Sequence, residues 1–356
     1  MNAMKSAMSP RERVLAVLRG QPVDKTPFTV YEYKIPQCAV ERKLRNAGLC
    51  IVNRRNSVFT TTRPNCVSES HSYTENGRAR TRSVVRTPVG ELSSVSEPAG
   101  FTSWTIEKFF KSREDYKALL FMVRDERIAP RYDAFTEAER WMGDDVILRA
   151  GVGACPLHQI MIHWMGVEVF SEEWAERRDE ILKLEAAMRE NLRKVYPIVA
   201  ASHATHANFG GNEVPEVMGP VRYREFCLPL FDECAGHFHR NGKLLGTHMD
   251  GNTRAWAADV ARCKLDYIEA FTPSPDTDMT LADALKAWPG KVMWINFPSS
   301  VHLFSIDKIK QTTRELIQAA AGTNRLIIGI TEDIPEDRWQ GNLLAISETI
   351  DEMAGV

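Results

Sequence analysis

Apolar positions along the chain follow two periods, one typical of helices and one typical of short buried strands. Ser9 and Pro10 open a segment whose apolar residues keep helical spacing as far as Leu18, and Gly20 stands where a helix usually ends. A short apolar segment at 26–33 then predicts a strand. The chain therefore begins with a capped helix followed by the first strand of a sheet.

Residues 52–105 differ in character from the rest of the chain. They are rich in Ser, Thr, Arg and Val, and turn sequences at 75–77 and 88–90 separate stretches of alternating polarity. Period-two alternation interrupted by such turns is typical of antiparallel hairpins. We predict that this region is a set of β-hairpins inserted into the main fold.

From residue 144 to the end, segments of strand character and segments of helical character alternate. The expected strands are 146–150, 200–209, 244–249, 266–271, 292–297 and 326–330. Strands that alternate with helices form parallel sheets through right-handed βαβ units. Together with 26–33 these make seven strands, so the eighth strand of a closed barrel is hidden from the pattern.

The chain has no G-x-G-x-x-G sequence and no P-loop, which favours a closed barrel over an open dinucleotide-binding sheet. We therefore predict an α/β fold, a (β/α)8 TIM-type barrel. Residues 1–356 are expected to form a single barrel domain that carries the hairpin region at 52–105.

The bulk composition excludes several classes of protein. With 45 Lys and Arg against 47 Asp and Glu, the formal charge of −2 offers no basic excess for binding nucleic acid. No run of about 18 apolar residues could span a membrane, and residues 1–10 lack the apolar stretch of a signal peptide. The seven cysteines form no C-x-x-C pair, which is typical of reduced thiols in the cytoplasm.

Polar residues at the ends of the predicted strands are the candidates for function, because a parallel barrel carries its active site at the carboxyl ends of its strands. Acids buried in a barrel mouth are costly unless they are paired or functional. The residues expected to bind substrate are Glu32, Asn208, Glu213, Glu269 and Asn296. For Glu32 and Glu269 an ion pair with a neighbouring Lys or Arg is the structural alternative.

His248 and Asp250 form the most specific pattern at these strand ends. Side chains two residues apart on a strand face the same side, so both would face the barrel mouth. With Glu332 from the last strand, one imidazole and two carboxylates could hold zinc and leave a position open for substrate. Alternatively, the same residues position substrate by hydrogen bonds without a metal. We predict His248, Asp250 and Glu332 as the catalytic residues and as the tentative metal ligands.

Three parts of the chain resemble proteins of the uroporphyrinogen decarboxylase superfamily. They are 9–27 at the start, 219–226 with 248–251 in the middle, and 329–335 with Asn342 at the end. The resemblance runs in order over nearly the whole chain, and it is closest to the corrinoid-dependent methyltransferase-like branch. It implies a barrel, and because many members are dimers it also implies a homodimer.

Two branches of this superfamily imply different reactions. The decarboxylases bind substrate carboxylates through arginines of an N-terminal loop; Arg45 resembles one of these, but Leu49 stands at the second position. The methyltransferases hold zinc with an H-x-C pair and a later cysteine. His248 matches that pattern, whereas Asp250 replaces the first cysteine and Glu332 lies near the position of the second. Carboxylates make a harder site than thiolates, suited to an oxygen or nitrogen leaving group.

The resemblance therefore implies a cytoplasmic methyltransferase that moves a methyl group between a small O- or N-methylated substrate and a corrinoid carried by a partner protein. His248, Asp250 and Glu332 would activate the leaving group. A cofactor-free decarboxylase and a non-catalytic ligand-binding barrel are the alternatives that the sequence leaves open.

Overall fold

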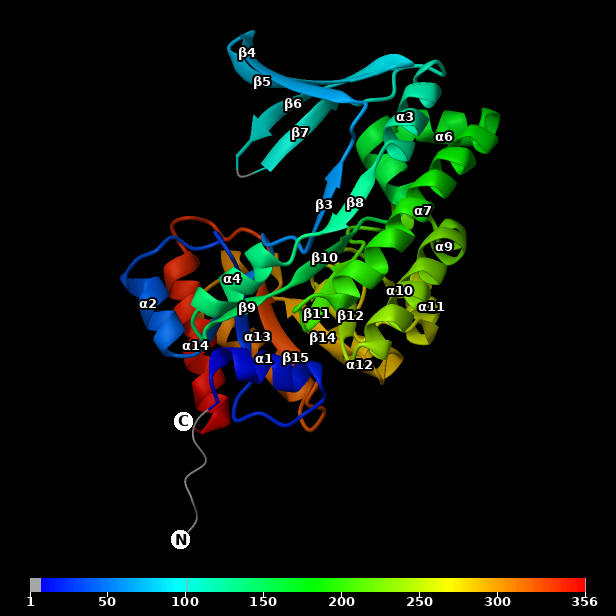
Figure 1. Ribbon diagram of the computed structural model, residues 1–356. Coiled ribbons are helices and arrows are strands. Elements are labelled where there is room, and N and C mark those ends of the chain that lie inside the picture. Colours follow the sequence, from blue (N-terminus) through cyan, green and yellow to red (C-terminus); the bar gives the residue numbers. More distant parts are fainter. Residues whose placement is uncertain (1–7, 101, 356) are drawn as a thin grey trace. The chain divides into compact units, whose positions relative to one another are not determined.

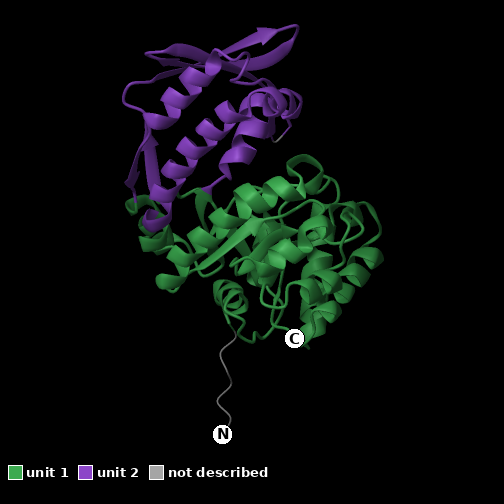
Figure 2. Cartoon of the chain, turned by 90° about the vertical axis from the view of Figure 1, so that its right-hand side faces the viewer, with its two compact units in different colours: residues 1–58, 132–152, 199–356 green, residues 59–131, 153–198 purple. Residues whose placement is uncertain are grey.

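The computed structural model describes residues 8–100 and 102–355, and these form two compact units. Unit 1 spans the described parts of 1–58, 132–152 and 199–356, and unit 2 spans those of 59–131 and 153–198 (Figure 2). The candidate site lies in unit 1, whereas the antiparallel strands lie in unit 2. Residues 1–7, which make up most of the stretch where no signal peptide was expected, lie outside the described part.

Unit 1 is built around a parallel β-barrel flanked by helices (Figure 1). Its strands are β1 (Phe28–Tyr31), β2 (Leu49–Asn53), β9 (Val146–Leu148), β10 (Ala150–Gly153), β11 (His206–Phe209), β12 (Leu244–His248), β13 (Tyr267–Phe271), β14 (Val292–Asn296) and β15 (Leu326–Ile330). They are bonded in the order β10-β11-β12-β13-β14-β15-β1-β2-β9. The two end strands, β9 and β10, are separated in the chain by Arg149 alone, so together they act as one strand that closes a ring of eight. The predicted (β/α)8 barrel is confirmed.

The strand that the sequence pattern did not reveal is β2. It follows helix α2 (Ala39–Asn46) and pairs in parallel with β1 on one side and β9 on the other. Val52 and Asn53 therefore belong to the barrel, and the antiparallel strands of the region predicted at 52–105 begin at Phe59. The pattern hid β2 because its few apolar residues run directly into the polar segment that follows.

The helices of unit 1 alternate with the barrel strands, as βαβ units require, and α1 precedes the first strand. They are α1 (Pro10–Leu18), α2, α4 (Asp133–Trp141), α8 (Pro215–Met218), α9 (Pro220–Arg222), α10 (Leu228–Arg240), α11 (Ala257–Arg262), α12 (Leu281–Ala287), α13 (Ile306–Ala319) and α14 (Trp339–Ala354). The capping box predicted for α1 is present, since Ser9 and Glu12 each accept a hydrogen bond from the other's backbone N–H. The strand expected at 200–209 is shorter, because the preceding helix continues to Ala201 and β11 begins at His206.

Unit 2 contains the predicted antiparallel hairpins. Strands β4 (Val67–Glu75), β5 (Arg78–Thr87), β6 (Gly90–Ala99) and β7 (Thr102–Glu107) form one sheet, and β3 (Phe59–Thr62) pairs with β8 (Arg127–Pro130). Val85, Leu92 and Val95 are buried on the sheet, which packs against helix α3 (Asp115–Arg124). Helices α5 (Pro156–His158), α6 (Val167–Glu176) and most of α7 (Arg178–Ala201) complete the unit.

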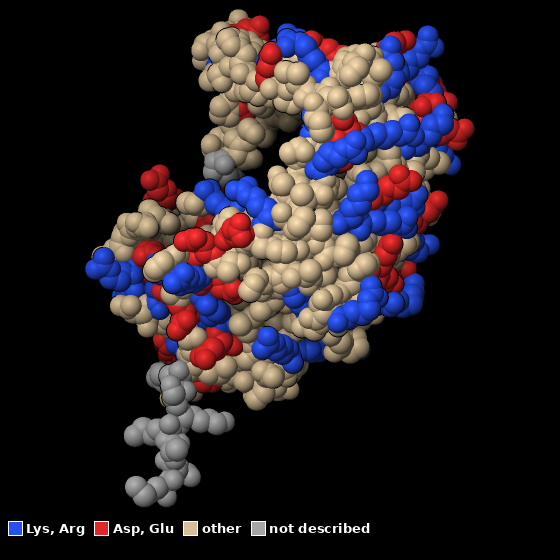
Figure 3. Space-filling view, in the orientation of Figure 1, with Lys and Arg blue, Asp and Glu red and all other residues tan. Residues whose placement is uncertain are grey.

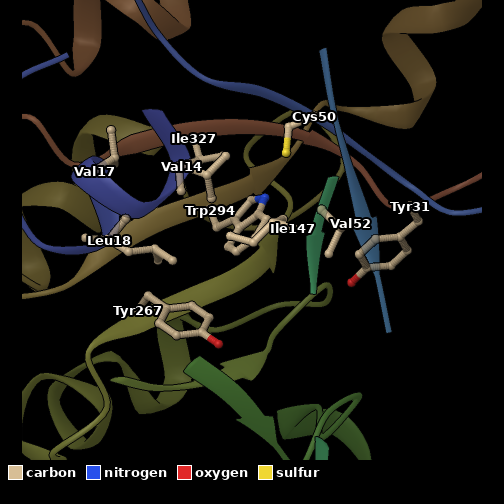
Figure 4. Close-up of a cluster of buried hydrophobic side chains, with 11 residues drawn as sticks. Val14, Val17, Leu18, Tyr31, Cys50, Val52, Ile147, Tyr267, Trp294 and Ile327 are labelled. Atoms are coloured by element: carbon tan, nitrogen blue, oxygen red, sulfur yellow. The ribbon is translucent and has the colours of Figure 1, made fainter. Parts of the chain in front are cut away.

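Aromatic rings fill the barrel interior beneath the polar strand ends. Tyr267 and Trp294 are fully buried, and they belong to a core cluster that also includes Val14 of α1 and Ile327 of β15 (Figure 4). Gly246 provides the space for one ring, because a Cβ at this position would come within 2.2 Å of the Tyr267 side chain. The core therefore forms the floor on which the site is built.

Acidic and basic side chains are interspersed over the visible face of each unit (Figure 3). Within the described residues, no helix is long and apolar enough to cross a membrane.

Candidate functional site

His248, Asp250 and Glu332 meet at the carboxyl ends of β12 and β15. His248 is the last residue of β12, Asp250 lies two residues further on, and Glu332 lies two residues after β15. One potential ligand atom from each side chain lies within 4.8 Å of the other two, and all three residues are partly exposed. The structure thus brings together the three residues that the strand-end pattern singled out, and their chemical role remains a prediction.

The imidazole of His248 lies between two carboxylates. Its Nδ1 is 2.8 Å from Oε2 of Glu269, and its Nε2 is 3.4 Å from Oδ2 of Asp250. Burial alone would lower the pKa of His248, but the negative charges of Glu269 and Asp250 raise it to about 9. Burial alone would raise the pKa of Asp250, but the hydrogen bond from His248 lowers it. Without a metal, the pair is therefore an imidazolium and a carboxylate near neutral pH.

Glu269 lies beneath this pair and is fully buried on β13. Its Oε1 is 2.8 Å from Nη1 of Arg149 and accepts a hydrogen bond from the hydroxyl of Tyr31. Burial alone would raise the pKa of Glu269, but the charges of Arg149 and His248 hold it well below its usual range. Glu269 is therefore a permanently ionised carboxylate at the base of the site.

Arg149 and Tyr31 are site residues that the sequence analysis missed. Arg149 lies between β9 and β10 and is buried, while Tyr31 ends β1 with its ring under the guanidinium of Arg54 at 3.4 Å. Burial raises the pKa of the Tyr31 phenol, so it remains a neutral donor. A signal for Arg149 was present in the sequence: a cation inside an apolar strand segment needs a buried anion as its partner.

Asn208 and Asn296, both predicted to bind substrate, hold other parts of the site. Asn208 donates from Nδ2 to Oε2 of Glu269 at 3.0 Å and accepts from the hydroxyl of Tyr267 at 2.7 Å. Asn296 accepts from the backbone N–H of Thr331 at 2.9 Å, which fixes the start of the loop that carries Glu332. Both amides therefore act within the protein in this structure.

Glu32 and Glu213 lie on loops at the same end of the barrel. Glu32 forms an ion pair with Arg54 at 3.2 Å, which is the structural alternative considered for it. Glu213 accepts a hydrogen bond at 2.9 Å from the backbone N–H of Gly211. A Cβ at position 211 would lie 3.0 Å from Cβ of His248, so the glycine lets this loop approach the imidazole closely.

Arg45, which resembles an arginine of the decarboxylase loop, is already engaged. It lies in the last turn of α2, where its guanidinium is 2.6 Å from Asp145 and 3.1 Å from Glu41. Both acids are close enough to neutralise its charge. Arg45 is therefore poorly placed to bind the carboxylates of a porphyrinogen.

The donor set of His248, Asp250 and Glu332 fits a divalent metal ion. One imidazole nitrogen and two carboxylate oxygens are three suitable ligands, and catalytic zinc sites typically use three protein ligands and keep one position open. Histidine ligands usually donate their other ring N–H to a carboxylate or carbonyl group. The contact between Nδ1 of His248 and Glu269 matches that arrangement.

Comparison with known proteins yields a shared fold. No protein-family model and no curated protein matches the chain. A methyltransferase from Methanosarcina mazei is similar over 97% of this chain and 99% of its own, with a TM-score of 0.56 and 14% identity. The alignment with the pneumococcal exo-β-D-N-acetylglucosaminidase StrH covers 92% of this chain and 85% of the StrH chain, with a TM-score of 0.40 and 10% identity. At such identities the likeness to the methyltransferase establishes the barrel, and the reaction has to be argued from the site.

Proposed function

We propose that this protein is a methyltransferase that moves a methyl group between a small O- or N-methylated substrate and a corrinoid carried by a partner protein. The observation that carries the proposal is the convergence of His248, Asp250 and Glu332, whose ligand atoms lie within 4.8 Å of one another at the end of a closed barrel. The barrel that the chain shares with the Methanosarcina mazei methyltransferase supports the same class of reaction.

The three residues suit the activation of a leaving group. When the methyl group leaves its oxygen or nitrogen for the corrinoid, negative charge develops on the atom left behind. A divalent metal held by His248, Asp250 and Glu332 would supply Lewis acidity at that atom. In the metal-free protein, His248 carries the proton needed for the same purpose, because its pKa is raised to about 9.

In this proposal, the position of each surrounding residue determines its role. Glu213 is buried and accepts a hydrogen bond from the backbone N–H of Gly211, so we assign it to shaping the loop that approaches His248. Asn296 places the loop that carries Glu332, and Asn208 holds Glu269. We assign Glu32 to orienting Arg54 over the ring of Tyr31.

Elemental analysis of freshly purified protein tests the metal part of the proposal. We expect stoichiometric zinc, lost in His248→Ala because one of three ligands is removed. His239→Ala is the matched control: His239 also pairs with an aspartate, Asp266, at 3.0 Å, but Asp266 lies at the amino-terminal end of β13, away from the site. Wild-type protein without metal, or equal zinc in both variants, would contradict the metal assignment.

Transfer of methyl groups to free cob(I)alamin, followed by its absorbance, tests the reaction. A methoxybenzoate, methanol and a methylamine serve as donors. We expect one of these classes to react, and His248→Ala to lower that rate by about 10²-fold to 10⁴-fold. No transfer from any donor, combined with release of carbon dioxide from uroporphyrinogen, would favour the decarboxylase instead.

A further inference from the structure

We propose that Glu269 is a positioning residue: its carboxylate holds the Nδ1–H of His248, so that Nε2 is the nitrogen presented to Asp250 and Glu332. That Nε2 binds a metal ion rests on the proposed function. The arrangement of the imidazole can be tested whether or not that function is correct. The role differs from the substrate binding predicted for Glu269 from the sequence, and Glu269 lies in the middle of β13 rather than at its end.

The surroundings of Glu269 leave its carboxylate no capacity for a ligand. Oε1 faces Nη1 of Arg149 and the hydroxyl of Tyr31, and Oε2 faces Nδ2 of Asn208 at 3.0 Å and Nδ1 of His248 at 2.8 Å. Two carboxylate oxygens offer about four lone-pair directions, and four protein donors occupy them. Because the residue is also fully buried, its carboxylate can act on a substrate or a metal ion through these neighbours alone.

The contact with Glu269 decides how the imidazole is used. A carboxylate accepts hydrogen bonds and cannot donate them, so the 2.8 Å contact requires a proton on Nδ1 of His248. The opposite nitrogen, Nε2, then points to Oδ2 of Asp250 at 3.4 Å. An imidazole held in this way has its ring orientation and its ligand atom chosen before any metal ion arrives.

A rigid support keeps Glu269 in place. Tyr267, on the same strand, donates to Oδ1 of Asn208 at 2.7 Å, and Asn208 in turn donates to Glu269. Arg149 supplies the compensating charge from the other side of the carboxylate. The alternative is that Glu269 merely neutralises Arg149, in which case His248 would bind a metal ion equally well without it.

Unit 2 provides an internal control for that alternative. Glu173 is also buried, and it accepts from the hydroxyl of Tyr116 at 2.8 Å and from Arg177 at 2.6 Å. This Tyr–Glu–Arg set resembles the one around Glu269, but among the described residues no histidine bonds to Glu173. Glu173→Gln therefore removes a comparable buried charge without changing the candidate site.

The experiment compares Glu269→Gln with Glu173→Gln by two readouts. The first is the affinity for zinc, measured by competition with a chromophoric chelator. The second is the downfield Nδ1–H proton resonance of His248 in metal-free, ¹⁵N-histidine-labelled protein, assigned by its loss in His248→Ala. We expect Glu269→Gln to weaken zinc binding by about 10-fold to 100-fold and to abolish the resonance. Glu173→Gln should leave both readouts unchanged.

A second variant keeps the proposal open to refutation if Glu269→Gln does not fold. Glu269→Asp retains the charge beside Arg149 but is one methylene shorter, so its oxygens withdraw from Nδ1 of His248. We expect the same weakening of zinc binding. A folded variant of Glu269 that keeps wild-type zinc affinity and the His248 resonance would overturn the proposal. Wild-type protein that shows the resonance but binds no zinc would refute the metal part of the proposed function while leaving the role of Glu269 intact.

Discussion

At the scale of single residues, the barrel interior contains a histidine that has to remain neutral. His206 on β11 is fully buried; its Nδ1 lies 3.0 Å from the hydroxyl of Thr205, while its Nε2 has no hydrogen-bond partner among the described residues. Its ring lies among aromatic side chains, with ring centres 5.9 Å from Tyr267 and 6.0 Å from Trp294. Burial, together with the charge of Arg149, lowers the pKa of His206 to about 3.

This residue should make stability depend on pH. The unfolded chain binds a proton at His206 below an ordinary pKa of 6.5, whereas the folded protein does so only near pH 3, so stability falls as the pH falls through this window. From about pH 7 to about pH 5, His206 should lower the free energy of unfolding by about 2 kcal/mol. Leucine cannot bind a proton, so the free energy of unfolding of His206→Leu should fall less between these two pH values than that of the wild type. Urea unfolding at both pH values measures the difference. The same pH dependence in the variant would show that His206 is not the group responsible.

At the scale of elements, neighbouring barrel strands fit together through differences in side-chain size. Gly246 of β12 lies opposite Tyr267 of β13 in the parallel register. The Tyr267 ring occupies the space that a larger residue at 246 would need, and its hydroxyl is tied to Ala207 and Asn208 at 2.8 and 2.7 Å. These two bonds prevent the ring from moving aside without disturbing the residues that hold Glu269.

A single methyl group on β12 should therefore be destabilising. We expect Gly246→Ala to lower the free energy of unfolding by about 1–3 kcal/mol, as overpacking of a core usually does. Gly290→Ala, in the turn before β14, is the control, because no other atom lies within 4 Å of its added Cβ; its effect should stay within about 0.5 kcal/mol. Equal stability of the two variants in urea unfolding would refute the size complementarity between β12 and β13.

At the scale of the whole barrel, strands that are not neighbours are connected by buried polar groups. In the strand order, β11 and β12 separate β10 from β13, and β14 and β15 separate β13 from β1. Arg149, Glu269 and Tyr31 come from these three distant places and meet through the carboxylate of Glu269. Removing one partner of a buried ion pair leaves an uncompensated charge, whereas replacing both removes the cost of desolvation as well.

The contribution of this connection should appear in a double-mutant cycle. Arg149→Met should lower the free energy of unfolding by about 3–5 kcal/mol, because it removes the buried cation 2.8 Å from the Glu269 carboxylate and leaves His248 as the remaining positive partner. Adding Glu269→Leu should restore part of that loss, since the buried charge is then gone. Urea unfolding of the wild type, both single variants and the double variant measures the coupling. A double variant destabilised by the sum of the two single effects would show that the residues act independently.

Local pattern predicted the barrel and the end of it at which the candidate site lies, but not every part. The alternation of strands and helices, and the capping box of Ser9 and Glu12, depend on neighbours in the chain, and the structure bears them out. Strand β2 escaped because its few apolar residues run directly into the polar segment that follows Asn53. The strand expected at 200–209 was too long because apolar residues of a helix end and of a strand follow one another without a break.

The amino-acid sequence by itself determined which residues stand at the strand ends of this protein, because in a parallel barrel the order of segments already places those ends together. That ordering is why His248, Asp250 and Glu332 could be selected in advance. Tertiary structure alone decided that Arg149 lies against Glu269. The two residues are 120 positions apart in the chain (269 − 149), and they meet because the strands close into a barrel. The hydrogen-bond partners of a buried charge depend on which side chains the closed barrel brings together, and the spacing of residues along the chain does not predict them.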